Sequence, residues 1–71
     1  MGIKKKLTKI IEDFEKLTNE DLQYFEWWTA YRIALKKCME FYDGTNENSK
    51  LIIYAQKLMY DHAERQLDKT F

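Results

Sequence analysis

The stretch from Tyr24 to Tyr42, YFEWWTAYRIALKKCMEFY, decides the fold that we predict for this chain. Its apolar residues recur every three or four positions, which is the spacing that lines one face of an α-helix. Glu26, Lys36 and Glu40 mark the opposite, solvent-facing side. The pattern predicts a helix from about Asn19 to Tyr42. Its apolar face comprises Tyr24, Trp28, Tyr31, Leu35, Cys38, Met39 and Tyr42.

A polar segment, DGTNENS at residues 43–49, follows this helix and reads as a loop. Gly44 can take the left-handed conformation that ends a helix, and Asn48 is a residue type that caps the next one. The spacing of apolar residues then predicts a helix from about Ser49 to Lys69. Its main stripe is Leu51, Ile52, Ala55, Leu58, Met59 and Ala63, and a second stripe is Ile53, Tyr60 and Leu67.

The N-terminal segment predicts a third helix, from about Ile3 to Leu17. Thr18 and Asp21 have the spacing of a capping box, in which each side chain accepts from the other residue's backbone N–H. We therefore expect the first helix to end near Leu17 and the second to begin at once. The face directed at the core consists of Ile3, Leu7, Ile10, Phe14 and Leu17.

Three amphipathic helices predict an all-α fold, a small three-helix bundle in one domain over residues 1–71. The two long helices form an antiparallel hairpin because their connecting loop is short, and the N-terminal helix packs across them. The chain contains no proline and no alternating apolar run that would predict a strand.

Length and charge exclude several classes of protein. Twelve basic and twelve acidic side chains balance, so the whole chain does not attract nucleic acid electrostatically. No apolar run is long enough for a transmembrane helix, and we recognise no signal peptide. The single cysteine also fits a reducing compartment, so we expect a cytoplasmic protein. Abundant Lys, Asn, Ile and Tyr indicate AT-rich coding, as in a low-GC bacterium or a phage.

Catalytic chemistry has few candidate residues in this chain. His62 is the only histidine and Cys38 the only cysteine, whereas a zinc site needs three or four ligands at suitable spacing. Cys38 lies on the apolar face of a helix, where a cysteine behaves as a small hydrophobic residue. His62 is interpreted as a hydrogen-bonded histidine at the edge of a helix. We therefore expect no enzyme activity, no catalytic residue, no metal and no cofactor.

The aromatic content predicts a protein-binding function. Five Tyr, four Phe and two Trp are many for one narrow core, and Tyr and Trp are enriched at interface hot spots. Trp27 and Trp28 project about 100° apart on a helix. We expect Trp28 at the centre of the buried face and the ring of Trp27 partly exposed on its flank. The predicted partner-binding residues are Trp27, Phe41, Ile53, Tyr60 and Leu67.

The expected partner is another protein or a second copy of the chain as a homo-oligomer. A small inhibitor or adaptor from a phage or mobile element, acting on a host protein, is one example that fits. The alternative is a small nucleic-acid-binding protein that uses the basic N-terminal segment. Its candidate residues are Lys4, Lys5, Lys6 and Lys9.

Overall fold

A computed structural model describes residues 2–70, which fold into three helices and, within that range, no strand. They are α1 (Ile3–Glu15), α2 (Glu26–Met39) and α3 (Asn46–Thr70). Each helix packs against the other two, and the bundle measures 39 × 18 × 15 Å. The predicted three-helix bundle is therefore confirmed. None of the described helices combines the length and the apolar composition that crossing a bilayer requires.

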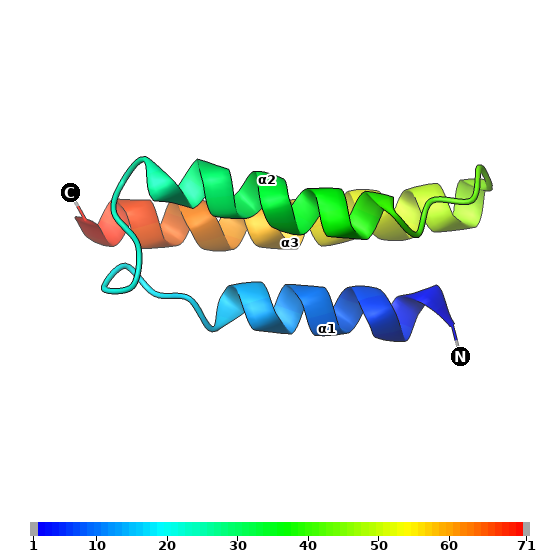
Figure 1. Ribbon diagram of the computed structural model, residues 1–71, viewed down its shortest axis with the longest axis horizontal. Coiled ribbons are helices and arrows are strands. Elements are labelled where there is room, and N and C mark those ends of the chain that lie inside the picture. The colour runs from blue at the N-terminus through cyan, green and yellow to red at the C-terminus, as the bar shows by residue number, and fades with distance from the viewer. Residues whose placement is uncertain (1, 71) are drawn as a thin grey trace.

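The three helices lie side by side along the long axis of the molecule (Figure 1). The α2–α3 hairpin is antiparallel, as the short loop predicts, and α1 runs parallel to α3. Because α1 lies along the hairpin and does not cross it steeply, all three helices contribute to the core over most of their length. The buried apolar residues are Leu7, Phe14, Trp27, Ala34, Cys38, Ile52, Ala55, Met59, Ala63 and Leu67.

The predicted centre of the apolar face on α2 is wrong. Trp27 is fully buried, whereas Trp28 is only partly buried. Ala34 and Cys38 follow Trp27 by seven and eleven residues, so they share its side of the helix and point into the bundle. Small side chains at these two positions let the helices approach closely. The prediction placed the centre of the face on the larger aromatic residues, Trp28 and Tyr31, which lie on the flank of the buried side.

The start of the second helix also differs from the prediction. Residues 16–25 form a linker, and α2 begins only at Glu26. Only half of the predicted capping box forms: the backbone N–H of Thr18 donates to Oδ2 of Asp21 at 2.7 Å, but the N–H of Asp21 donates to the carbonyl oxygen of Thr18. The chain makes a turn after Thr18, however, and does not continue directly into a helix. Oε1 of Glu26 accepts from the N–H of Gln23 at 2.7 Å and closes the turn that does precede α2.

Two side chains of α3 hold this linker in place. Nε2 of His62 lies 2.7 Å from the carbonyl oxygen of Leu17, and Oε1 of Gln66 accepts from the N–H of Asn19 at 2.9 Å. Both contacts satisfy linker backbone groups that a helix would otherwise pair internally. The linker therefore follows α3 in an irregular conformation.

The loop between α2 and α3 contains the predicted left-handed glycine, but α2 ends at Met39, three residues before the predicted end at Tyr42, and the cap of α3 also lies earlier than predicted. Gly44 has φ +87°, the left-handed region that favours glycine. Oδ1 of Asp43 accepts from the N–H and the hydroxyl of Thr45, at 2.9 and 2.7 Å, and these bonds lower the pKa of Asp43. The Thr45 hydroxyl in turn accepts from the N–H of Asn48 at 3.3 Å. Helix α3 therefore starts at Asn46, three residues before the predicted start at Ser49.

We expect truncation of the two tryptophans to affect stability in the order opposite to that predicted from the sequence. Trp27→Ala removes a fully buried ring and should cost about 3–5 kcal/mol of unfolding free energy. That is a large share of the stability of a domain this small. Trp28→Ala should cost clearly less, because part of its ring already contacts solvent. Urea unfolding followed by circular dichroism measures both, and equal losses would contradict the structure.

Candidate interaction surface

Three aromatic rings meet on the surface where α2 and α3 pack together. The ring centroids of Trp28 and Tyr60 are 5.4 Å apart, and Tyr31 lies 5.9 Å from each of them. Trp28 and Tyr31 are partly buried, while Tyr60 is 41% exposed. Because one edge of the cluster rests on the bundle, the rings are held in place while presenting area to solvent.

Two aliphatic side chains extend this cluster toward the loop end of the bundle. Ile53 is 60% exposed, and Met39 is also exposed. A shallow groove of about 230 Å³ lies beside Ile53, lined by Tyr31, Ile53, Gln56, Lys57 and Tyr60. We call the surface formed by Trp28, Tyr31, Met39, Ile53 and Tyr60 the α2–α3 face.

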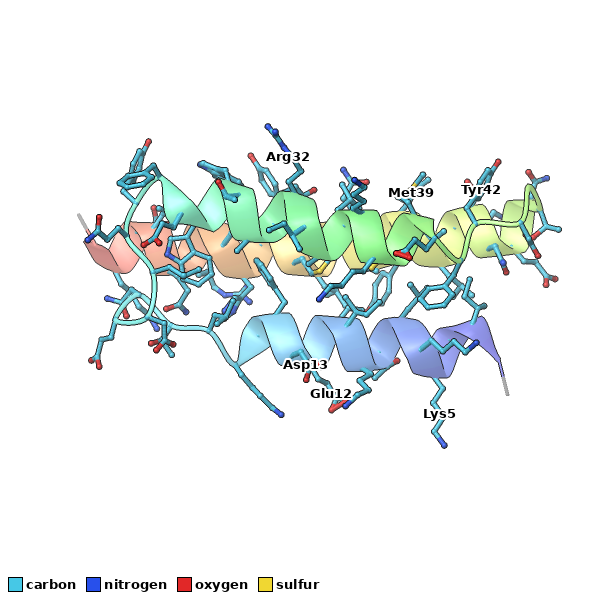
Figure 2. All side chains as sticks on the ribbon, in the orientation of Figure 1. Lys5, Glu12, Asp13, Arg32, Met39 and Tyr42 are labelled. Carbon is cyan, nitrogen blue, oxygen red and sulfur yellow. The ribbon has the colours of Figure 1, made fainter. Side chains whose placement is uncertain are left out.

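The α2–α3 face lies on the side of the hairpin away from α1. The groove between α1 and α2 is lined on α2 by Ala30, Ile33, Ala34 and Lys37, and that between α1 and α3 on α3 by Leu51, Tyr54 and Leu58. Trp28 and Tyr60 project from the other flanks of their helices. Figure 2 shows Arg32, Met39 and Tyr42 pointing away from α1. The residues that line the two grooves beside α1 therefore lie on other flanks of α2 and α3 than the residues of the face.

The hydroxyl of Tyr60 is oriented by its neighbour one turn along α3. A hydrogen bond to Glu64, together with the negative charge of that carboxylate, raises the pKa of Tyr60. Tyr60 thus stays a protonated donor in neutral solution. Its hydroxyl lies toward Glu64 at the border of the aromatic cluster, and its ring packs on Trp28.

The structure brings two of the five predicted partner-binding residues, Ile53 and Tyr60, onto one surface. Trp27 and Leu67 are buried, so the exposure predicted for them is wrong. Phe41 is partly buried, and Nζ of Lys6 lies 5.3 Å from its ring centroid. Phe41 therefore packs toward α1 and lies outside the α2–α3 face.

The burial of Leu67 follows from helix geometry. A step of seven residues turns an α-helix about 20° short of two full turns, so Ile53, Tyr60 and Leu67 drift around α3. The drift carries Leu67 toward the bundle interior. Trp28, Tyr31 and Met39, in contrast, were predicted on the core-facing side of the second helix, yet Trp28 and Tyr31 are only partly buried and Met39 is exposed. The drift of about 20° at each step of seven residues is the signal in the sequence that could have separated Leu67 from Ile53 and Tyr60.

The N-terminal lysines do not gather on one surface. Lys6 lies over Phe41, Lys4 lines the groove between α1 and α3, and Lys5 points away from the bundle. Lys9 is exposed one turn after Lys5, so these two share one side of α1. Glu12 and Asp13 point outward from α1 with Lys5 (Figure 2). Positive and negative side chains are therefore mixed on the outer side of α1, where Lys16 and Asp13 form an exposed ion pair at 3.8 Å.

The surroundings of His62 are those of a residue in the bundle core. It is buried, its ring packs edge to face with those of Phe14 and Trp27 at 5.7 Å, and its Nε2 faces the Leu17 carbonyl. A carbonyl oxygen only accepts, so Nε2 carries the proton and donates it. Among residues 2–70, no group of three His, Cys, Asp or Glu side chains could hold a metal ion.

Comparison of this chain with protein-family models, with curated proteins and with solved structures finds no match in any of the three.

Cys38 should behave as a buried, unreactive thiol. Burial raises its pKa above the ordinary value of 9.0. The folded state therefore holds the thiol proton more tightly than the unfolded state, and this contribution to stability is present below pH about 9 and lost as the pH rises through the folded value. The free energy of unfolding should fall more steeply above pH about 9 for the wild type than for Cys38→Ala, as measured by urea unfolding. Equal slopes would contradict the burial of the thiol.

Proposed function

We propose that this protein is a non-enzymatic binding module that recognises another protein surface through the α2–α3 face. The observation that supports the proposal is the cluster of Trp28, Tyr31 and Tyr60, packed ring against ring yet open to solvent. Tyr and Trp supply much of the binding energy in protein interfaces because each ring buries a large area and carries a polar edge.

The three rings are also preorganised for binding. Immobilising a flexible side chain at an interface costs conformational entropy, which subtracts from affinity. The three rings already restrain one another, and Tyr60 is further held by Glu64. A partner that covers them therefore orders little that is not already ordered. This is the property expected of the centre of an interface.

The apolar residues beside the rings add apolar surface area that folding of the chain does not bury. Ile53 and Met39 remain exposed, although buried apolar residues elsewhere on α3 and α2 already form the core. Contiguous apolar surface of this kind marks protein-binding sites in soluble domains. Two adjacent helices with a shallow groove between them form the shape into which the apolar side of a third helix packs. The partner is either a different protein or a second copy of this chain.

The proposal predicts that neutral, polar substitutions on the face abolish binding without unfolding the chain. Ile53→Gln together with Tyr60→Gln keeps the net charge and a good helix-forming residue at both positions. We expect proteins that the immobilised wild type captures from a bacterial lysate to be lost with this double variant, since truncated hot-spot residues each cost about 2 kcal/mol or more. Quantitative mass spectrometry of the captured proteins provides the measurement.

The matched control is Ile33→Gln together with Tyr54→Gln. These residues have the same types and similar exposure, 53% and 61%, but lie on the grooves beside α1. The control should capture the same proteins as the wild type, and circular dichroism should show all three proteins equally helical. Capture that survives in the face variant, or that is lost equally in the control, contradicts the proposal.

A further inference from the structure

Four basic side chains border the α2–α3 face. On α2, Arg32 lies one turn after Trp28, and Lys36 lies one turn before Met39. On α3, Lys50 and Lys57 flank Ile53 at distances of three and four residues. Residues three or four apart are neighbours on a helix surface, so each of these cations stands next to an apolar residue of the face.

These cations are available to a partner. All four side chains are exposed, and within residues 2–70 none of them forms an ion pair with another side chain. Lys57 lines the groove itself, together with Tyr31 and Tyr60. We refer to Arg32, Lys36, Lys50 and Lys57 as the basic rim.

The basic rim is local and not a property of the whole chain, whose net charge is zero. On α3 the acidic residues Asp61, Glu64 and Asp68 lie beyond the rings toward the C-terminal end. Glu64, the nearest of the three to the face, already bonds Tyr60. The border of the aliphatic half of the face, from the rings to the α2–α3 loop, thus carries more positive than negative charge, with Lys50 and Lys57 on α3, and with Arg32 and Lys36 against Glu40 on α2.

We propose that the occupant of the α2–α3 face is an amphipathic helix of another protein whose apolar stripe is flanked by Asp or Glu. The inference rests on the proposed function and adds the chemistry of the partner. Trp28 to Met39 spans about 16 Å at 1.5 Å per residue, and Ile53 to Tyr60 about 10 Å. A helix of about three turns covers this length, with apolar residues at positions i, i+3 or i+4, and i+7. Its carboxylates then lie opposite the basic rim on both sides.

A second copy of this chain matches the face less well. Arg32 and Lys57 lie near the middle of the length of the face, so a two-fold axis through the middle would bring each of them close to one of these cations of the second copy. Like charges placed together at an interface oppose binding. The outer side of α1 does not supply an acidic helix either, because Lys5 and Lys16 lie there beside Glu12 and Asp13. An acidic partner avoids both conflicts.

Three synthetic helical peptides of about 18 residues test this inference. They share one stripe of leucines at i, i+3, i+4 and i+7, and the flanking positions are all Glu, all Gln or all Lys. In titration calorimetry at low salt, we expect the Glu peptide to bind the wild type about tenfold more tightly than the Gln peptide, because exposed ion pairs each contribute little. The Lys peptide should bind most weakly. The differences should shrink as salt screens the charges.

Charge reversal provides the specific control. Arg32→Glu with Lys57→Glu should invert the order, so that the Lys peptide binds best. Lys5→Glu with Lys9→Glu makes the same change of net charge on α1, away from the face, and should leave the order unchanged. An order that follows net charge in both variants, or that does not depend on the flanking charge, overturns the inference, as does failure of all three peptides to bind.

Failure of the inference and failure of the proposed function are distinguishable. If the three peptides bind equally and Ile53→Gln with Tyr60→Gln abolishes their binding, the face binds helices and only the acidic character of the partner is wrong. If that variant binds all three peptides as the wild type does, the proposed function fails too.

Sedimentation equilibrium tests whether a second copy of the chain occupies the face. A wild-type dimer that becomes monomeric in the same variant assigns the face to a second copy and overturns the inference.

Discussion

The packing of three rings, one from each helix, is the interaction on which the rest of this structure depends. Phe14 of α1, Trp27 of α2 and His62 of α3 meet edge to face, with centroids 5.7 to 5.9 Å apart. A bundle of this length has few buried side chains, and Trp27 is the largest of those that are fully buried. Its indole Nε1 finds no acceptor among residues 2–70. Leaving a buried donor unpaired costs about 1–3 kcal/mol, so the ring packing must outweigh this cost.

The same contact sets the path of the chain between α1 and α2. His62 both packs on Trp27 and donates a hydrogen bond to the Leu17 carbonyl. One turn further along α3, the side chain of Gln66 accepts a hydrogen bond from the N–H of Asn19. The backbone of the linker is thereby satisfied by side chains more than forty residues away in the sequence. Helix α2 cannot begin until the chain has passed these contacts, and Trp27 then stands in its first turn.

The position of Trp27 also decides the character of the surface. Adjacent residues on a helix point about 100° apart, so a buried Trp27 places Trp28 on the flank of α2. There Trp28 meets Tyr31 and Tyr60 and, with Ile53 and Met39, forms the α2–α3 face. The basic side chains beside it follow from the same rotation, since Arg32 is one turn after Trp28. One buried ring thus orients both the aromatic cluster and the charges that border it.

The sequence by itself determined the number and type of the elements. The spacing of apolar residues, the absence of proline and the turn residues around Gly44 suffice for three helices and an antiparallel hairpin, because these signals act within one turn or one loop. It also placed Ile53 and Tyr60 outside the main stripe of α3. Tertiary structure alone decided which flank of α2 is buried, because apolar residues make up more than half of that helix and only packing by two neighbours selects the Trp27 side. It likewise decided the linker, whose polar groups pair with His62 and Gln66, partners that no local pattern can indicate.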